Sequence, residues 1–445
     1  MNDRMKIVVV GGGSYQWVPN LVADLMRTPS LADMHIVLED IDPKPLPDMA
    51  RWVEKAAEHY GQPATVSHTT DQREALDGAD AVVVTISTGG FASMGQDLAV
   101  PERYGIKQSV GDSVGPGGIN RAARNIPVLV GIGRDMAELC PDAWMLNITN
   151  PMTVLTRSVR KATGIKAVGL CHEIAHVRWS FALLCGVGPD DVELTLTGIN
   201  HFPLVTAVRV GERDGFEVLR EVVDGTFEDV PWANEFTSAA AFKQTNQLKL
   251  ALWEEWGALP AAGDRHLAEF LPGFLTEDSG WGERWGVHLT SIADRERDQA
   301  KYVTRVADLL SGAEEPPQGD SGEMVAPFLD SLLTGTERVM PLNLPNVGQA
   351  GDLPADVVVE AMVKVGKDGP APGPAVHAPA PAAELVRRHS AVQEMVVEAV
   401  LTQDRELLKA AYTLDPLAGR IDSRSVRQMA DDLLTATEAW LPAGW

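Results

Sequence analysis

Three features of the sequence predict an α/β protein with a doubly wound parallel sheet. Short, almost wholly apolar runs alternate with helical patterns in the first 195 residues, as expected for strands buried on both faces. A glycine run follows the first strand directly, where Rossmann-type sheets bind a dinucleotide. After about residue 195 the pattern changes to antiparallel strands and separate helices. We therefore expect a Rossmann-type domain at 1–195 and a second, α+β domain at 196–445.

The strands expected in the first domain end at polar or glycine-rich turns. They cover residues 6–10, 35–40, 80–87, 144–147 and 167–170. The second domain is expected to hold strands within 193–211, 216–226 and 339–365 and helices over 232–256, 281–312, 322–333, 383–411 and 423–440. Because the carboxyl ends of parallel strands meet at one edge of a sheet, the polar residues after the first set of strands should gather there.

Composition and charge limit the classes of function. Of the 445 residues, 45% are hydrophobic and 22% charged, an ordinary balance for a globular protein. The 62 acidic and 38 basic residues leave a net charge of −24, which predicts binding neither to nucleic acid nor to an anionic membrane surface. No secretory apolar region precedes the first strand, and no run reaches the ~18 apolar residues of a membrane span. With only three cysteines, we expect a cytoplasmic protein.

The glycine run predicts a nucleotide site. Gly11 and Gly13 follow the strand at 6–10, and Ser14 leads into a helical pattern. Glycines let backbone N–H groups approach a pyrophosphate, and the start of a helix favours its negative charge. The third glycine of the usual G-x-G-x-x-G pattern is replaced by Gln16. A plain strand–helix turn is the alternative.

A carboxylate at the end of the second strand strengthens the nucleotide prediction. Asp40 ends the apolar run at 35–40, at the spacing at which an acidic side chain accepts hydrogen bonds from a ribose diol. Glu39 and Asp42 are rival candidates for this role. Ser87 ends the strand at 80–87 and should lie near the nicotinamide.

A glycine-rich segment at 95–127 and the sequence Asn147-Ile148-Thr149-Asn150-Pro151 supply further polar groups to the same edge. We expect a loop at 109–118 and a helix from about Gly118 to Leu139. The side chains that can act here are those of Asp112, Asn120, Arg121, Arg124 and Asn150.

Cys171 and His201 are candidate metal ligands. Cys171 ends the strand at 167–170, and His201 follows thirty residues later in Gly198-Ile199-Asn200-His201-Phe202. A thiolate and an imidazole beside a nicotinamide could hold a divalent ion that polarises a substrate hydroxyl. Because the spacing matches no local zinc motif, a buried free cysteine and a hydrogen-bonded core histidine remain the alternatives.

The motifs together resemble glycoside hydrolase family 4 over essentially the whole chain. They are GGGS at 11–14, NITNP at 147–151, GLCHE at 169–173, GINHF at 198–202, GDRHLAEF at 263–270 and NLPN at 343–346. The resemblance implies a fold similar to lactate and malate dehydrogenases, the cofactors NAD and Mn²⁺ or another divalent metal, and a homodimer or homotetramer. It also implies that the second domain carries substrate and metal contacts. The substrate would be a small glycoside.

The resemblance implies cleavage by oxidation and elimination. NAD would take hydride from C3 of the sugar, a base would remove the C2 proton, and the glycosidic oxygen would leave. Water would then add, and the hydride would return. Cys171 and His201 match the family's metal ligands, and Asn150 matches an amide that contacts substrate.

Two departures from the phosphoglucosidase members are informative. These members follow the cysteine with Asp or Asn and use a tyrosine base, whereas this chain has His172 and no tyrosine within 232–275. Asp264 is therefore the expected base, with a helix N-cap as its alternative role. His172 is expected to protonate the leaving oxygen or to contact the sugar, and a structural hydrogen bond is its alternative.

The segment at 108–127 and GLCHE look most similar to the α-galacturonidase-like branch. A uronide carries a carboxylate that an arginine should pair with, and Arg121, Arg124 and Arg265 are unranked candidates. His266, beside Arg265, is also expected to bind the substrate. We expect an α-glycosidase acting on α-galacturonides or α-glucuronides. The alternatives are a 6-phospho-glycosidase or unphosphorylated α-glucosidase or α-galactosidase of the same family, an NAD-dependent hydroxy-acid dehydrogenase, and a cofactor-binding sensor.

Overall fold

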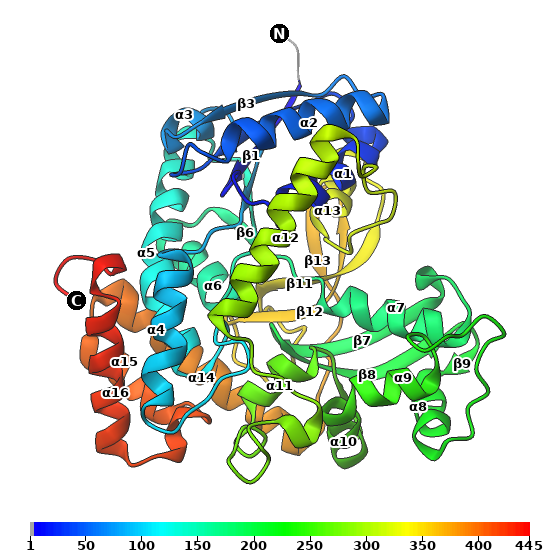
Figure 1. Cartoon of the computed structure of the whole chain (residues 1–445), viewed down its shortest axis with the longest axis vertical. Coiled ribbons are helices and arrows are strands. Elements are labelled where there is room, and N and C mark those ends of the chain that lie inside the picture. The colour runs from blue at the N-terminus through cyan, green and yellow to red at the C-terminus, as the bar shows by residue number, and fades with distance from the viewer. Residues whose placement is uncertain (1–3) are drawn as a thin grey trace.

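The computed structural model describes residues 4–445, which form one mixed sheet between helices (Figure 1). Six strands in the order β3-β2-β1-β4-β5-β6 make its parallel half. They span Met5–Val10 (β1), Met34–Glu39 (β2), Thr65–Thr69 (β3), Ala81–Val84 (β4), Trp144–Asn147 (β5) and Lys166–Gly169 (β6). This is the strand order of a Rossmann fold, so the predicted fold class is confirmed.

The remaining strands continue the same sheet beyond β6 in antiparallel fashion, in the order β11-β12-β7-β8-β10. They span Val192–Ile199 (β7), Phe202–Val210 (β8), Arg213–Asp214 (β9), Leu259–Pro260 (β10), Arg338–Pro345 (β11), Val358–Gly366 (β12) and Gly369–Pro372 (β13). Strands from both halves of the chain therefore share one sheet. The domain boundary at residue 195 stays a prediction.

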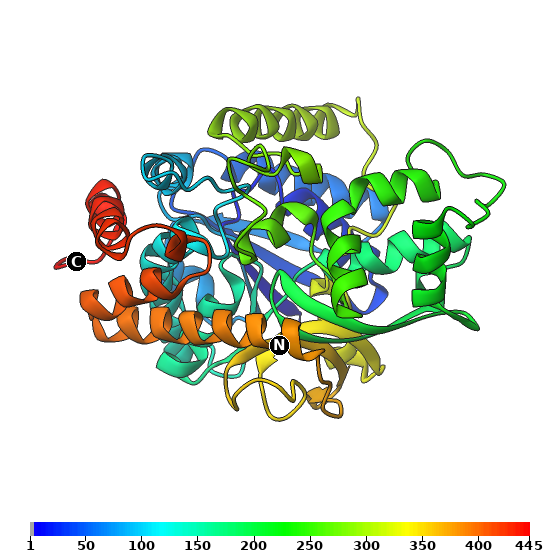
Figure 2. The same ribbon diagram turned by 90° about the horizontal axis from the view of Figure 1, so that it is seen from below.

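Helices cover both faces of the sheet. The first half contributes α1 (Val18–Arg27), α2 (Leu46–Tyr60), α3 (Gln72–Leu76), α4 (Gly90–Glu102), α5 (Gly115–Leu139), α6 (Met152–Thr163) and α7 (Glu173–Cys185). The second half contributes α8 (Gly215–Asp224), α9 (Ala239–Thr245), α10 (Gln247–Trp256), α11 (Asp264–Phe270), α12 (Ile292–Ser311), α13 (Val325–Thr334), α14 (Ala380–Thr402), α15 (Arg405–Leu414) and α16 (Ser423–Ala436). Figure 2 shows the long helices α12 and α14 on opposite sides of the sheet.

The side chains of the central strands point alternately to the two faces of the sheet and so form two main hydrophobic cores. Val8 and Val10 of β1 belong to one hydrophobic cluster, whereas Ile7 and Val9 belong to the other, because successive side chains of a strand point to opposite faces. All four are buried. This pattern explains why continuous apolar runs predicted the parallel strands correctly. Within residues 4–445, no helix is long and apolar enough to cross a membrane.

Several expected elements differ from the structure. The strand expected at 80–87 ends at Val84, so Ser87 lies in the turn after it. The helix expected over 232–256 is two helices that begin only at Ala239, and the helix expected over 383–411 is interrupted between Thr402 and Arg405.

Residues 216–226 lie mostly in α8, not in a strand, because Asp214 accepts the N–H of Phe216 and so caps a helix there. Within 281–312 the long helix begins only at Ile292. Helix α5 begins at Gly115, before the expected Gly118, because its first N–H groups are accepted by distant side chains. Gly115 donates to Asp415 at 3.1 Å and Gly117 to Gln108 at 2.8 Å.

Candidate active site

The residues predicted to bind a nucleotide surround one cavity of about 840 Å³, here called the glycine-turn cavity. Its lining includes Gly11, Gly13, Ser14, Asp40 and Ser87. Gly11 has φ of 90°, and a Cβ there would lie 2.0 Å from the carbonyl oxygen of Thr85. Only glycine fits this position, so the turn can bring its backbone close to a ligand. The C-terminal segment also reaches the cavity, through Trp440.

Three carboxylates line the acidic side of this cavity. Asp40 accepts the N–H of Gly13 at 3.0 Å through Oδ2 and that of Asp42 at 3.0 Å through Oδ1. Glu39 is almost fully buried, and burial raises its pKa to about 7. Asp42 is exposed. The geometry therefore favours Asp40 over Glu39 as the charged acceptor beside the glycine turn, and its ribose contact stays a prediction.

A second cavity of about 450 Å³, here called the middle cavity, adjoins the first and shares Ser14, Ser87 and Gln299 with it among other residues. Asn150 and Asp112 line it, so the two polar segments expected at the strand edge do meet there. Nδ2 of Asn150 lies 3.5 Å from Oδ2 of Asp112. The Asn150 side-chain oxygen is buried without a hydrogen-bond partner.

Two arginines also line the middle cavity. Arg121 donates from Nε to the carbonyl oxygen of Asn150 at 3.0 Å. Arg295 donates from Nη2 to the carbonyl oxygen of Val110 at 2.9 Å, and its Nε is buried without a partner. Two guanidinium groups in one small cavity suit an anionic group of a ligand. Arg295 was not predicted, because nothing in α12 distinguishes it from the other charged residues of that helix.

The other two arginine candidates lie elsewhere. Arg124 is completely buried and pairs with Asp97, so its guanidinium is not free for a ligand. Arg265 is exposed, bonds Thr290 and does not line the middle cavity. Of the arginines, Arg121 and Arg295 therefore line the middle cavity, whereas Arg124 and Arg265 do not.

His201 lies at the tip of the tight β7–β8 hairpin with φ of 62°, a region that non-glycine residues seldom adopt. Its Nδ1 lies 2.7 Å from Oγ of Ser113, which itself donates to Asp112 at 2.7 Å. Because the single hydroxyl proton goes to Asp112, we infer that Nδ1 of His201 is protonated and that Nε2 carries a free lone pair. Burial lowers the pKa of His201 to about 3. A neutral imidazole held in this way is a suitable metal ligand.

His266 completes a group of possible metal ligands. The donor atoms of Asp112, His201 and His266 lie within 4.8 Å of one another, and the two imidazole rings are 3.9 Å apart. The Nδ1 atom of His266 is buried without a partner. Although burial opposes it, the neighbouring imidazoles and Arg121 hold the pKa of the Asp112 carboxyl well below its usual range. One carboxylate and two imidazoles are a donor set that divalent transition metals accept.

Cys171, the other predicted metal ligand, is close to Asn200. It is buried, and burial together with the charges of Glu360 and Glu173 raises the pKa of its thiol well above the usual value. Asn200 contacts it and also donates to Glu360 at 3.4 Å. The second oxygen of Glu360 is buried without a partner, and burial raises its pKa to about 8. A cation beside them would favour the ionised forms of the thiol and the carboxyl, so the residues present fit a bound divalent ion.

The Cys171 thiol does not belong to the group of donors within 4.8 Å, among the residues from 4 to 445. Its role as a metal ligand therefore stays a prediction. Asp112 and His266 are the ligand candidates that sequence reasoning missed. The fold alone brings them beside His201, from segments at residues 112, 201 and 266.

The Asp264 carboxylate is engaged with the start of α10. It accepts the N–H groups of Leu248 at 2.8 Å and Lys249 at 3.1 Å. It therefore caps a helix, but a different one from the helix α11 that it begins. Burial raises its pKa, opposed by the charge of Lys249. Its role as a base stays a prediction beside this capping role.

His172 is held by a buried carboxylate. Its Nδ1 lies 2.9 Å from Oε1 of Glu323, and the side chain is 30% exposed. Burial would lower the pKa of His172, but the hydrogen bond and charge of Glu323 together raise it. A partly exposed imidazole with one nitrogen fixed can exchange a proton at the other.

Comparisons with known proteins agree with these motifs. The sequence model of a family described as "Family 4 glycosyl hydrolase" matches residues 6–184. The model of the C-terminal domain of the same family matches residues 196–418. An α-galacturonidase of Bacillus subtilis (strain 168) is 34% identical over 97% of this chain and 97% of its own. A Bacillus subtilis protein provisionally named a glucosidase has a solved structure with a TM-score of 0.87 at 32% identity, covering 97% of this chain and 100% of that one.

More distant structures share the fold. A 6-phospho-β-glucosidase of Thermotoga maritima, solved with manganese, NAD⁺ and glucose-6-phosphate, has a TM-score of 0.81 at 20% identity, over 99% of this chain and 100% of that one. A lactate dehydrogenase of Cryptosporidium parvum has a TM-score of 0.54 at 15% identity, over 90% and 99%. The expected likeness to dehydrogenases is confirmed at the level of the fold. Since the two family descriptions together match most of the sequence, the chain belongs to the family 4 glycosyl hydrolases.

Proposed function

We propose that this protein cleaves α-galacturonides with the help of NAD and a divalent metal ion such as Mn²⁺. The observation that carries the choice of substrate is the pair Arg121 and Arg295, which both line the middle cavity. A uronic acid differs from a neutral sugar by one carboxylate, and paired guanidinium groups bind carboxylates strongly and with defined orientation. The Bacillus subtilis relative named α-galacturonidase supports the same choice.

In the proposal, Gly11, Gly13, Ser14 and Ser87 hold the dinucleotide, and Asp40 accepts hydrogen bonds from its ribose. The acidic lining beside Asp40 favours NAD over a cofactor with a 2′-phosphate. The metal ligands are His201 and Cys171, and the structure adds Asp112 and His266 as candidates. When bound, NAD supplies hydride transfer and the metal ion supplies polarisation of a sugar oxygen.

The chain's own residues would hold and move the protons. Asn150, Arg121 and Arg295 orient the sugar in the middle cavity. His172 donates a proton to the leaving oxygen while Glu323 fixes its ring, and this is supported by the raised pKa of His172. Asp264, whose carboxylate also accepts two N–H groups at the start of α10, takes the C2 proton.

A substrate panel tests the proposal. The para-nitrophenyl α-glycosides of galacturonate, glucuronate, galactose and glucose 6-phosphate are assayed with NAD and Mn²⁺. We expect cleavage of the galacturonide without net formation of NADH. Preference for the 6-phosphate would assign the two arginines to a phosphate, and accumulation of NADH would indicate a hydroxy-acid dehydrogenase. Arg295→Met should lower kcat/KM on the galacturonide by about 10- to 100-fold, since a charged hydrogen bond contributes about 1.5–3 kcal/mol.

Two wider expectations belong to the same proposal. A reducing, cytoplasmic setting is supported by the three free thiols of Cys140, Cys171 and Cys185. Assembly into a homodimer or homotetramer stays a prediction, which light scattering can test.

A further inference from the structure

The glycine-turn cavity has an apolar part that the middle cavity does not share. Ile41, Pro45, Val128, Ile132 and Trp440 line the glycine-turn cavity but not the middle cavity. They come from the turn after β2, the start of α2, the middle of α5 and the C-terminal segment. This apolar part is therefore the end of the glycine-turn cavity that lies away from the proposed sugar site.

Two of these apolar side chains are exposed. Ile41, directly after Asp40, is 93% exposed, and Val128 of α5 is 38% exposed. A single exposed apolar residue is common on protein surfaces, but several around one cavity suit a ligand with an apolar face. A dinucleotide carries such a face at the end opposite its nicotinamide, because adenine is a flat, uncharged aromatic ring. The apolar end of the cavity therefore suits adenine.

Trp440 adds an aromatic wall to this end of the cavity. It is the last residue of the short 3₁₀-helix η5 (Glu438–Trp440), which follows α16. Its indole lies against the turn after β4, since a Cβ added to Gly89 would be 2.8 Å from Cδ2 of the indole. Gly89 has φ of 79° and lines the cavity itself. Trp440 is only partly buried, so part of its ring is free for a ligand.

The C-terminal segment is fixed to the rest of the protein on both sides of Trp440. The backbone N–H of Trp440 donates to the carbonyl oxygen of Thr437 at 2.9 Å. Thr437 is completely buried, and its hydroxyl accepts a hydrogen bond from Asn120 of α5 at 3.1 Å. Leu441 and Trp445 pack against the main hydrophobic core. The indole is therefore in place before a ligand binds, so that little conformational freedom is lost on binding.

We propose that Trp440 contacts the face of the adenine ring of NAD, and that Ile41 and Val128 complete the adenine pocket. This inference rests on the proposed function, because it assigns the dinucleotide to the glycine-turn cavity. It gives the C-terminal segment a part in holding the cofactor. Stacking of a base on an aromatic side chain strengthens binding by about 10- to 100-fold, and removal of the indole should weaken binding by that factor.

Two fragments of NAD test the assignment with the full-length chain. ADP-ribose contains the adenine, whereas nicotinamide mononucleotide lacks it. Isothermal titration should show that Trp440→Ala weakens the binding of ADP-ribose and NAD by about 10- to 100-fold and leaves that of the mononucleotide unchanged. Trp440→Phe keeps an aromatic face and should regain most of the affinity. Unchanged affinity for ADP-ribose in Trp440→Ala, or an equal loss for both fragments, would overturn the proposal.

Fluorescence gives a second measurement, with a variant that keeps a large aromatic side chain. A purine stacked on an indole quenches the indole emission. ADP-ribose at saturation should therefore quench the tryptophan emission of the wild type more than that of Trp440→Phe. Trp232→Phe is the matched control, at a tryptophan that is 53% exposed and lines neither cavity, and it should be quenched like the wild type. Equal quenching in Trp440→Phe and the wild type would show that the indole does not touch the adenine.

The two proposals fail in different ways. If the wild type binds neither ADP-ribose nor NAD, the dinucleotide site of the proposed function is wrong. If the wild type binds both and cleaves the galacturonide, but the Trp440 variants bind and are quenched like the wild type, the function stands and the role of Trp440 is wrong.

Discussion

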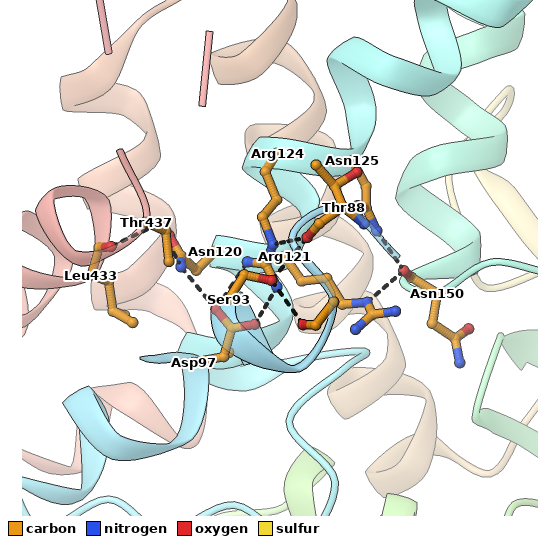
Figure 3. Close-up of polar contacts among 12 residues, drawn as sticks. Thr88, Ser93, Asp97, Asn120, Arg121, Arg124, Asn125, Asn150, Leu433 and Thr437 are labelled. Carbon is orange, nitrogen blue, oxygen red and sulfur yellow. Dashed lines mark hydrogen bonds and ion pairs between the residues drawn. The ribbon is translucent and has the colours of Figure 1, made fainter. Parts of the chain in front are cut away.

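Two buried polar groups of residues lie beside helix α5 and differ in one respect. In the paired cluster, formed by Asp97, Asn120, Arg124 and Thr437, the charged groups bond one another. Arg124 donates to both oxygens of Asp97, and Asn120 donates to Asp97 at 2.8 Å and to Thr437 at 3.1 Å (Figure 3). In the open cluster, formed by Asp112, Asn150, His201, His266 and Glu360, three side-chain atoms are buried without partners.

This difference in hydrogen bonding distinguishes a cluster that stabilises the fold from one that can bind a ligand. A buried polar group without a protein partner costs about 1–3 kcal/mol, so several in one place suit a site that a ligand or water completes. Arg121 and Arg124, one helical turn apart, fall on opposite sides of this division. Figure 3 shows Arg124 directed to Asp97 and the carbonyl of Thr88, and Arg121 directed to Asn150. Together they connect the cavity-lining turns after β4 and β5 to α5.

The largest effect is expected from opening the paired cluster. Arg124→Met leaves the buried charge of Asp97 without its partner, so the free energy of unfolding should fall by about 3–5 kcal/mol. Urea unfolding measures this. Arg209→Met, which removes an exposed pair with Glu193, should cost at most about 1 kcal/mol. The double variant Asp97→Leu/Arg124→Met should regain part of the loss, and a stable Arg124→Met protein would show that the cluster is not structural.

Near the open cluster, a substitution is expected to lower activity and to leave the free energy of unfolding almost unchanged. Cys171→Ser should change the unfolding of the metal-free protein little. It should lower Mn²⁺-dependent turnover by at least about 100-fold, because even the outer partners of metal ligands contribute 10- to 100-fold. Manganese binding followed by electron paramagnetic resonance, together with turnover, checks this. Cys185→Ser is the control at a thiol in another core. Normal manganese affinity in Cys171→Ser would remove Cys171 from the ligand set.

Local sequence patterns predicted part of the fold and of the candidate site, whereas groups that only folding brings together were missed. The parallel strands were predictable because each is a local apolar run, and the glycine turn because Gly11 has no substitute. The motifs placed Cys171 and His201 near each other. Asp112, Arg295 and Glu323 were not assigned roles, because only the folded chain brings their segments together. The α8 segment was misread because its valines and leucine suit a strand as well as a helix, and the cap at Asp214 decides between them.

The buried His389 extends the comparison to pH. His389 donates from Nε2 to the carbonyl oxygen of Phe270 at 2.7 Å, and burial lowers its pKa to about 4. The unfolded chain binds a proton near pH 6.5 and the folded one only near pH 4, so stability is lost as pH falls through this window. From pH 8 to pH 5 this amounts to about 2 kcal/mol. Unfolding curves of the wild type and of His389→Gln should differ by this pH dependence, and parallel curves would contradict it.

A substitution of Asp264 can show whether its carboxylate only stabilises the fold or also acts as the catalytic base. If its carboxylate only caps α10, Asp264→Asn should lower the free energy of unfolding by about 1 kcal/mol, since the amide keeps one acceptor oxygen but loses the charge. Exchange of the C2 proton of the sugar with deuterated solvent should then continue. If Asp264 is also the base, exchange stops while the protein stays folded. Mass spectrometry of recovered substrate distinguishes the two. Loss of exchange would show that a side chain fully engaged in the scaffold can still serve the chemistry, and would weaken the rule that unpaired groups mark the site.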